Sequence, residues 1–272
     1  MAPRKVGFVG LGNMAQAMFK RWIVSGAASV GEVYGYDPNE SLCASLHKSF
    51  GINIASDNAE LARVCDALIL AVKPQYADEA LSQLPLQLPV GDFTGKAVLS
   101  IIAGWTTAAL RARLPGAMVA RVMPNTPAMV GEGVFAVSRD HTFSEELTAW
   151  MTGALERCGR VFFVRECDLE AVTGLSGSGP AYGFIFIEAM ADAGVRLGLP
   201  RSLAYEMAAQ TLTGAGRMAL ESGQIPAALK DAVCSPGGTT IEAVYALERG
   251  GFRAAVIDAV CASAAKAAAM RG

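Results

Sequence analysis

Six residues near the amino terminus have the types and the spacing of a loop that binds a dinucleotide. The sequence Gly10-Leu11-Gly12-Asn13-Met14-Ala15 follows the apolar run Val6-Gly7-Phe8-Val9 and precedes a run that favours helix. Glycine at position 10 permits a tight turn, Gly12 lets the backbone approach a pyrophosphate, and the small Ala15 lets the helix pack closely on the strand. We therefore predict a dinucleotide site here; the alternative is a tight strand-to-helix turn without a ligand.

The next apolar run ends in Tyr36 and Asp37, which we include among the cofactor-binding residues. A carboxylate at this position commonly accepts hydrogen bonds from the adenosine ribose, which favours NADH over NADPH. The alternative is that Asp37 only begins an Asp-Pro-Asn turn. No Arg or Lys lies between Tyr34 and Leu46, so this segment offers no cation for a 2′-phosphate, although the Ser41 hydroxyl is nearby.

Two further apolar runs end in residues that we expect to line the same cleft, because open α/β sheets bind ligands outside the carboxyl ends of their strands. These residues are Ala71, Val72, Lys73 and Pro74 after the first run, and Ile101, Ile102 and Ala103 after the second. For Lys73 the alternative is an ordinary solvated lysine. The segment Arg121 to Pro127 also follows a strand; it either borders the nicotinamide or only connects strands.

A second segment with chemical potential lies in the other half of the chain. Ser235-Pro236-Gly237-Gly238-Thr239-Thr240 precedes a helical run from Ile241 to Glu248. Its glycines allow close backbone approach, and the NH groups at a helix start attract an anion without help from arginine. A small carboxylate is the natural ligand, so Ser235, Gly238, Thr239 and Thr240 are candidate substrate-binding residues. The alternative is an ordinary helix start, capped by Thr239 or Thr240.

The scarcity of histidine narrows the chemistry. The two histidines, His47 and His141, lie in polar segments away from the candidate site. A hydroxy-acid dehydrogenase with a histidine base is therefore not indicated. Reduction of a C=N bond requires less of the protein, since an iminium with a pKa near neutrality arrives already protonated and has only to be oriented for hydride transfer. A threonine hydroxyl would suffice.

The elements that would hold these residues change in character along the chain. Short apolar runs alternate with helical stretches from Lys5 to Val164, at Val6 to Gly10, Val33 to Tyr36, Ala67 to Val72, Ala97 to Ala103, Val119 to Met123, Val134 to Val137 and Val161 to Val164. This alternation predicts an α/β fold with a Rossmann-type, doubly wound, mostly parallel sheet over residues 1–165. Residues 166–272 favour helix throughout and predict an all-α domain.

Composition excludes several classes of function. The 272 residues carry a net charge of −2, which recruits neither nucleic acid nor an anionic membrane. We expect no membrane span, no secretory signal and therefore a cytoplasmic protein. The six cysteines form no C-x-x-C pair and do not cluster with histidine, so we expect free thiols, mostly buried, and no metal site. The apolar fraction of 52% suggests extra surface buried between subunits.

The segment from Leu229 to Glu248 closely resembles the signature of the pyrroline-5-carboxylate reductases. Four other segments resemble the same family in the same order: Gly10 to Ala15, Ala71 to Gln75, Arg121 to Pro127, and Thr173 to Tyr182. From its residues alone we interpret this last segment as close helix packing rather than a ligand site.

The resemblance implies an enzyme of the last step of proline biosynthesis, which reduces L-1-pyrroline-5-carboxylate to L-proline with NADPH or NADH. It also implies that the helical domains pair into a homodimer, and that five dimers assemble into a decamer. The matching positions make Thr240 the catalytic residue, hydrogen-bonded to the ring nitrogen of the substrate. The NH groups of Gly238 and Thr239 would hold its carboxylate, and Glu166 would lie close by. The implied nucleotide contacts are Gly10 to Ala15, Asn58, Val72, Lys73 and Ile101 to Ala103.

Two residues depart from the family pattern. The family usually has Asn where this chain has Ala232, which removes one expected cofactor contact across the dimer. It usually has Ser, Asn or Arg near Asp37, where a carboxylate would repel a 2′-phosphate.

Alternative functions are a β-hydroxyacid dehydrogenase, a related cyclic-imine reductase and a nucleotide-sensing oligomer without catalysis. The first normally needs a lysine early in the second half, and no lysine lies between Asp168 and Lys230.

Overall fold

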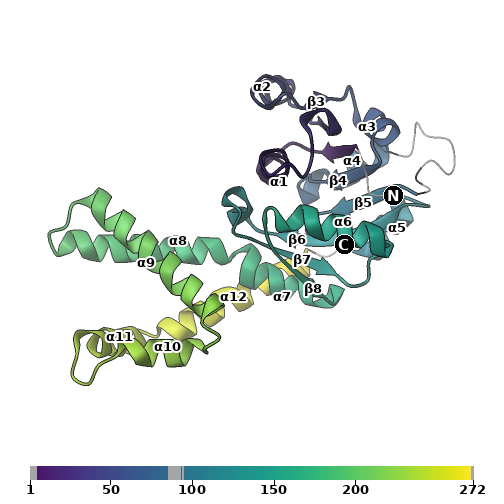
Figure 1. The fold of residues 1–272 in the computed structure, drawn as a ribbon. Coiled ribbons are helices and arrows are strands. Elements are labelled where there is room, and N and C mark those ends of the chain that lie inside the picture. The colour runs from purple at the N-terminus through teal and green to yellow at the C-terminus, as the bar shows by residue number, and fades with distance from the viewer. Residues whose placement is uncertain (1–4, 85–92, 94, 271–272) are drawn as a thin grey trace. The chain divides into compact units, whose positions relative to one another are not determined.

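The computed structural model describes residues 5–84, 93 and 95–270 (Figure 1). By internal contacts the chain divides into two compact units, residues 1–178 with 262–272, and residues 179–261. Each unit is described by itself below. Every peptide bond among the described residues is trans.

The described part of the first unit contains one eight-stranded sheet, in the order β3-β2-β1-β4-β5-β6-β7-β8. Its strands are β1 (Val6–Val9), β2 (Val33–Tyr36), β3 (Asn53–Ile54), β4 (Ala67–Leu70), β5 (Ala97–Ser100), β6 (Met118–Pro124), β7 (Gly133–Ser138) and β8 (Gly159–Val164). All neighbouring strands pair in parallel except β6 and β7, which are antiparallel. The predicted Rossmann-type, mostly parallel sheet is confirmed, and β1 is an interior strand with β2 and β4 on either side.

Helices follow the strands of this sheet and bury both of its faces. They are α1 (Asn13–Val24), α2 (Glu40–Phe50), α3 (Asn58–Val64), α4 (Ala77–Gln83), α5 (Thr107–Arg113), α6 (Glu145–Glu156) and the short α7 (Leu169–Val172). Adjacent residues of β4 show why the strands are apolar throughout: Ile69 packs in one core cluster with α1 and α6, whereas Leu68 and Leu70 pack in another with α3, α4 and α5. A strand covered on both faces has no polar side.

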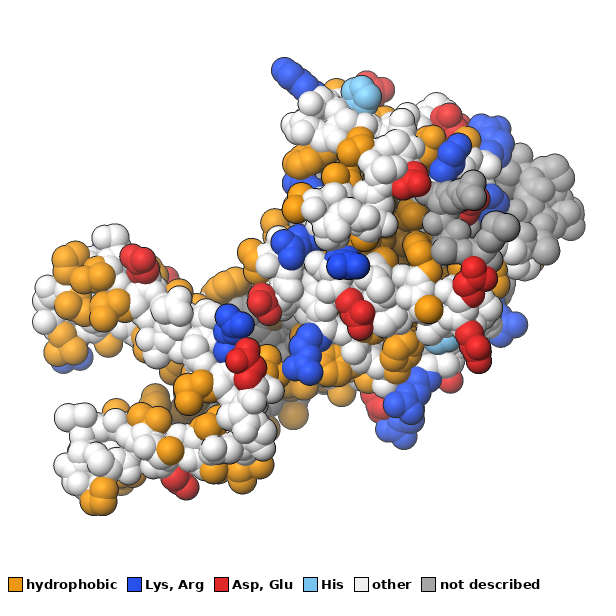
Figure 2. Space-filling model, viewed as in Figure 1, with side chains coloured by type: hydrophobic (Ala, Val, Ile, Leu, Met, Phe, Trp, Pro, Cys, Tyr) orange, Lys and Arg blue, Asp and Glu red, His pale blue; other side chains and the backbone are white. Residues whose placement is uncertain are grey.

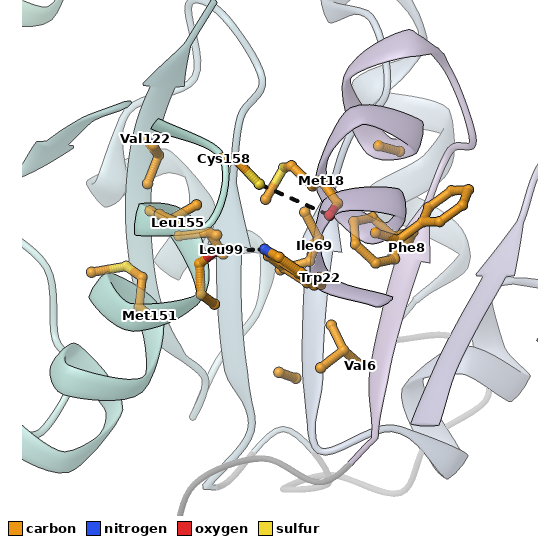
Figure 3. Packing of buried hydrophobic residues seen from close by; sticks show 14 of the residues in the cluster. Val6, Phe8, Met18, Trp22, Ile69, Leu99, Val122, Met151, Leu155 and Cys158 are labelled. Carbon is orange, nitrogen blue, oxygen red and sulfur yellow. Dashed lines mark hydrogen bonds between the residues drawn. The ribbon is translucent and has the colours of Figure 1, made fainter. Parts of the chain in front are cut away.

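In one of the two core clusters, α1 packs with α6 over the same face of the sheet (Figure 3). Phe8 of β1 and Trp22 of α1 are at most 2% exposed, and their ring centroids are 5.5 Å apart. The indole Nε1 of Trp22 donates a hydrogen bond of 2.6 Å to the carbonyl of Ala154, which satisfies the polar atom of a buried ring. This bond links two helices that are 132 residues apart in the sequence.

Replacing Trp22 by Phe will lower the free energy of unfolding by about 1 to 3 kcal/mol, because it leaves the buried Ala154 carbonyl without its donor and opens a small cavity. Urea unfolding followed by circular dichroism measures the change. Trp150→Phe is the matched control, since Trp150 is half-buried at the edge of the same cluster and should cost less than half as much. Equal losses would contradict the role assigned to the Trp22 bond.

The second unit consists of helices with little core of their own. They are α8 (Gly179–Arg196), α9 (Arg201–Glu221), α10 (Pro226–Val233), α11 (Thr239–Arg249) and most of α12 (Phe252–Ala269). The helical character that the sequence predicted for this half of the chain is confirmed. The buried hydrophobic cluster in this unit comprises three alanines, Ala191, Ala204 and Ala208.

Large apolar side chains lie instead on the surface of these helices (Figure 2). Phe184 and Ile185 on α8 are each 66% exposed, and Ile257 on α12 is 61% exposed. Other exposed apolar residues are Leu203, Met207, Met218, Leu220, Ile225, Val233, Tyr245 and Val256. An apolar surface of this extent is typical of a protein interface, in keeping with the high apolar content of the sequence.

Candidate functional site

The loop between β1 and α1 has the conformation that the sequence predicted for a dinucleotide loop. Gly10 has a φ of +89°, in the left-handed region that favours glycine. A Cβ atom there would also lie 2.9 Å from Cγ1 of Val72 and 3.0 Å from the carbonyl oxygen of Ala71. The fold itself therefore requires glycine at position 10.

Gly12 differs from Gly10 because nothing inside the protein demands it. A Cβ atom at Gly12 would meet no atom within 4 Å, and its φ of −65° suits any residue. Gly12 is the N-cap of α1, and no side chain caps the NH groups of the first helical turn. Open space beside free NH groups fits a bound diphosphate, which needs both close approach and donors.

A pocket of about 340 Å³ lies at this loop, at the carboxyl ends of β1, β2 and β4. Eight predicted cofactor residues line it: Gly10, Gly12, Tyr36, Asp37, Asn58, Ala71, Val72 and Lys73. The sequence did not single out six other lining residues, Val9, Pro38, Tyr76, Glu79, Ala80 and Gln83. Most of these belong to α4 or to the short helical turn before it, whose only signal in the sequence is its place directly after Lys73-Pro74.

The other predicted cofactor residues do not line this pocket. Leu11 and Ala15 are fully buried in the core, where Leu11 packs on Gly35 of β2. The remaining ones are Asn13 and Met14 in the first turn of α1, Pro74 after β4, and Ile101, Ile102 and Ala103 after β5. Ile102 is only 2% exposed and belongs to the core cluster of α3, α4 and α5. Leu11, Ala15 and Ile102 therefore offer a ligand only their backbone groups.

Asn58 carries an unsatisfied polar atom in the pocket wall. The residue is 4% exposed, and its Oδ1 has no hydrogen-bond partner among the described residues. Its Nδ2 donates to Oε1 of Gln83 at 3.0 Å. A buried carbonyl oxygen without a donor is costly in an empty pocket.

Asp37 connects the end of β2 to the dinucleotide loop. Its Oδ2 accepts a hydrogen bond of 3.0 Å from the backbone NH of Leu11, and its Oδ1 accepts one of 3.0 Å from the NH of Asn39. The second bond forms the turn that the sequence allowed as an alternative role. The first was not foreseen, and it fixes the carboxylate at the mouth of the pocket.

Glu166 is held in a polar cluster of the first unit. Its Oε1 accepts hydrogen bonds from the NH of Thr107 at 2.7 Å and from the Thr107 hydroxyl at 3.0 Å. The same oxygen lies 3.3 Å from Nη1 of Arg121, whose Nη2 lies 3.7 Å from Glu170. The side chains of Arg121 and Glu166 are only 7% and 18% exposed. Glu166 thus anchors the start of α5, directly after the loop that contains Ile101 to Ala103.

Replacing Glu166 by Ala will lower the free energy of unfolding by about 3 kcal/mol, because it leaves the nearly buried Arg121 with one distant carboxylate and removes the acceptor of the Thr107 NH and hydroxyl. Chemical unfolding measures this loss. Asp168→Ala is the control, since Asp168 pairs with Arg165 on the exposed surface and should change stability by less than about 1 kcal/mol. A Glu166 variant as stable as this control would refute the structural role.

The Gly-Gly-Thr-Thr segment forms the start of α11, in the second unit. Gly238 is the N-cap, Thr239 and Thr240 are the first two helical residues, and no side chain caps the NH groups of this turn. Neither threonine therefore caps the helix, which was the alternative that the sequence left open. A helix start with free NH groups carries partial positive charge and binds carboxylates.

The loop before α11 shapes this helix start. Gly237 has a φ of +66°, and a Cβ atom on Gly238 would overlap Oγ of Ser235, which lies over it. The NH of Gly238 donates to the carbonyl of Ser235 at 3.0 Å. Of the two NH groups expected to hold a carboxylate, that of Gly238 is thus already engaged within the loop, whereas Thr239 lies in the first turn, where helices leave NH groups free. The Thr240 side chain is half-buried.

The segment Ser176 to Gly179 is neither a simple turn nor part of the lining of the dinucleotide pocket. Thr173–Gly177 forms one π-helical turn between α7 and α8. A Cβ atom on Gly177 would lie 2.8 Å from Cε of Met123, so the glycine permits close packing, as the sequence suggested. Asn125 ties this turn to the sheet: its Nδ2 donates to the carbonyl of Ser176, and its Oδ1 accepts from the NH of Val134. Asn125 therefore has a positioning role.

The described residues offer few groups for acid–base or nucleophilic chemistry. All six cysteines are free; Cys43, Cys65 and Cys158 are buried, while Cys167 and Cys261 are exposed. Burial raises the pKa of the Cys65 thiol to about 12, so this sulfur is not a thiolate at neutral pH. His141 is partly desolvated, which lowers its pKa, and it lies beside Phe143 and Phe163 outside the dinucleotide pocket.

Neither a metal site nor a membrane-spanning helix occurs among the described residues. No group of acidic, histidine or cysteine side chains there has the arrangement of a metal site. No helix there is both long enough and apolar enough to cross a membrane.

Comparison with known proteins gives consistent results over both halves of the chain. Residues 166–270 match the family model for pyrroline-5-carboxylate reductase dimerisation, and residues 5–104 match a model described as NADP oxidoreductase, coenzyme F420-dependent. The chain is 43% identical over 242 residues to the pyrroline-5-carboxylate reductase of Escherichia coli, which covers 89% of this chain and 88% of that protein.

Solved structures agree with these matches. The pyrroline carboxylate reductase of Plasmodium falciparum, solved with NADP bound, has a TM-score of 0.89 at 33% identity, with all of both chains covered. A pyrroline-5-carboxylate reductase from Coxiella burnetii has a TM-score of 0.88 at 31% identity, with 99% of each chain covered. The sheet, the dinucleotide loop and the helical half with its uncapped Gly-Gly-Thr-Thr turn therefore belong to one established architecture, and this chain is a member of the pyrroline-5-carboxylate reductase family.

Proposed function

We propose that this protein reduces the C=N bond of L-1-pyrroline-5-carboxylate to give L-proline, with NADPH or NADH as the reductant, as the last step of proline biosynthesis. The observation that carries the proposal is the uncapped start of α11 at Gly238-Thr239-Thr240, in a chain of this family that also has a dinucleotide pocket. The relatives' names support the substrate, and the NADP-bound relative supports the cofactor.

Residues of both units have distinct roles in this proposal. The NH groups that follow Gly12, together with the pocket lined by Asp37, Asn58 and Lys73, would hold the dinucleotide, whose reduced nicotinamide supplies the hydride. The NH groups at the start of α11 hold the substrate carboxylate, and the Thr240 hydroxyl hydrogen-bonds the ring nitrogen. Together these contacts orient the imine, and orientation is the main requirement when the substrate brings its own proton.

The substrate's own protonation, rather than a protein side chain, sets the pH dependence in this proposal. Ser235 to Ile241 contains no ionisable side chain, and neither His47 nor His141 lines the dinucleotide pocket. His47→Asn and His141→Asn will therefore leave the pH profile of kcat/KM for the imine unchanged within about 0.3 pH units, well inside the ordinary spread of side-chain pKa values. Steady-state rates between pH 5 and 9 measure this. A profile that loses one limb in either variant would identify a histidine acid or base.

We expect the chain to self-associate through the exposed apolar surface of the second unit. Its residues lie within the match to a dimerisation family model, and its exposed apolar side chains lack a core within the unit. The substrate site is proposed to function in a homodimer, with five dimers forming a decamer. Sedimentation equilibrium should give about ten times the chain mass of 28.3 kDa; a monomer mass would contradict both levels of assembly.

A steady-state assay tests the proposed reaction. The purified protein, given L-1-pyrroline-5-carboxylate, should consume NADH or NADPH and produce an equal amount of L-proline. Absence of turnover with both coenzymes, in protein shown to bind the nucleotide, would overturn the reductase assignment.

A further inference from the structure

We infer that this chain binds the coenzyme without a 2′-phosphate, NADH, in preference to NADPH, and that Asp37 and Glu40 determine this specificity. The inference deepens the proposed function, on which it rests for the coenzyme class. It goes against the NADP-bound relative and is argued from side chains of this chain alone.

The position of Asp37 supplies the first argument. In Rossmann-type sheets the residue at the end of the second strand contacts the hydroxyls of the adenosine ribose. Here the carboxylate is fixed in that place, because its two oxygens accept bonds from the NH groups of Leu11 and Asn39. Each oxygen retains a further lone pair, so the group can still accept a bond from a ribose hydroxyl. It cannot turn away from a phosphate without breaking both bonds.

The second argument is the absence of a compensating cation. A pocket of about 590 Å³ adjoins the first one and shares Tyr36, Asp37 and Pro38 with it, so Asp37 lies on the wall between the two. Glu40 lines this second pocket and adds another carboxylate. Among the described residues that line either pocket, Lys73 is the one lysine or arginine, and it follows β4, on the far side of β1 from Asp37.

His47 offers a phosphate at most one of its two ring nitrogens. It lines the second pocket, and its Nδ1 lies 2.9 Å from the carbonyl oxygen of Ile52, so this nitrogen is already bonded within the protein. Ser41 lies in the first turn of α2, yet it does not line either pocket, which removes the hydroxyl that the sequence left available. A 2′-phosphate would therefore meet the carboxylates of Asp37 and Glu40 and, among the described lining residues, no lysine or arginine on that side of β1.

Asp37 and Glu40 also determine which hydrogen bonds this wall offers. Their carboxylates, when ionised, only accept hydrogen bonds. A ribose with free hydroxyls brings donors to such a wall, whereas a phosphate group brings acceptors only. Charge and hydrogen bonding thus favour the same coenzyme, and a like charge close to a phosphate costs a factor of about ten or more in affinity.

Calorimetric titration with two fragments, ADP-ribose and its 2′-phosphate, tests the inference without requiring turnover. The wild type should bind ADP-ribose at least tenfold more tightly. Asp37→Ser should reduce that preference at least tenfold, while Glu145→Gln, an equal change of charge on α6 outside both pockets, should leave it unchanged. Equal or tighter binding of the 2′-phosphate by the wild type would overturn the inference.

Two further results keep this test decisive. If Asp37→Ser does not fold because the loop loses its tether, Glu40→Gln leaves that tether in place and should reduce the preference about threefold; no change would overturn the role of Glu40. The experiments distinguish a failure of this inference from a failure of the proposed reaction. Tighter binding of ADP-ribose in a protein that does not reduce the imine would support the specificity and refute the reductase, whereas turnover with a preference for NADPH would do the opposite.

Discussion

Replacing Thr240 by Ala lowers kcat/KM for L-1-pyrroline-5-carboxylate by about 100-fold, the usual cost of losing a donor that acts on the reacting group. Coenzyme affinity should stay unchanged, because Thr240 is not among the residues that line the dinucleotide pocket. Thr240→Ser retains the hydroxyl and should keep most of the activity. Parallel measurement of turnover and of coenzyme binding separates this effect from general damage to the fold.

Thr239 provides the matched control within the same turn. Its side chain is exposed, so Thr239→Ala should change kcat/KM less than threefold. Thr239→Pro removes only the backbone NH, at the first helical position, where proline is well tolerated, and the extended Gly238 before it suits a following proline. This variant should fold normally and raise KM about tenfold, the cost of a lost hydrogen bond to a charged group. An unchanged KM would remove the helix start from the carboxylate site.

Replacing Gly12 by Ser lowers affinity for the coenzyme at least tenfold while leaving the protein as stable as before, or more stable. The site has room for the added atoms, and serine is a better N-cap than glycine. Its hydroxyl oxygen would accept bonds from the NH groups of the first turn of α1. These are the donors that a diphosphate needs, so the side chain competes with the ligand for them.

Gly10→Ala is the comparison for Gly12→Ser, because the fold requires glycine at position 10 but not at position 12. It places a Cβ atom on a residue with positive φ and against Val72, so it should lower the free energy of unfolding by about 1 to 3 kcal/mol. Thermal unfolding without ligand, followed by titration with NADH, distinguishes the two glycines. If Gly12→Ser bound the coenzyme as tightly as the wild type, the loop would not be the diphosphate site.

The sequence predicts the parts of the fold that follow from local burial. The strands are continuously apolar because helices cover both faces of the sheet, as Leu68 and Ile69 show, so their positions could be predicted from composition alone. The two-residue strand Asn53–Ile54 was missed because it lies at the edge of the sheet and is half-buried. The antiparallel pairing of β6 with β7 depends on tertiary packing, which no local pattern records.

The candidate site also has features that the sequence predicts and features that it does not. Motif spacing located the residues around Gly10, Asp37 and Val72 in one pocket, because carboxyl ends of parallel strands meet at one edge of a sheet. The bonds that define individual roles could not be predicted. Glu166 meets Arg121 across 45 residues of sequence, and Asp37 meets the Leu11 NH across 26. Two adjacent threonines in the sequence leave open which residue caps α11. In the structure Gly238 is the N-cap, so neither threonine has this role.

Transfer of deuterium from the reduced nicotinamide to the product tests the central claim most directly. The wild type is incubated with L-1-pyrroline-5-carboxylate and NADH that carries deuterium at C4 on both faces, and the product is analysed by mass spectrometry and NMR. The account predicts L-proline with one deuterium on the ring carbon that had been double-bonded to nitrogen, and at least 50-fold less labelled product from Thr240→Ala, in line with the usual loss of a transition-state donor. Unlabelled proline, or equal labelling by Thr240→Ala, would contradict it.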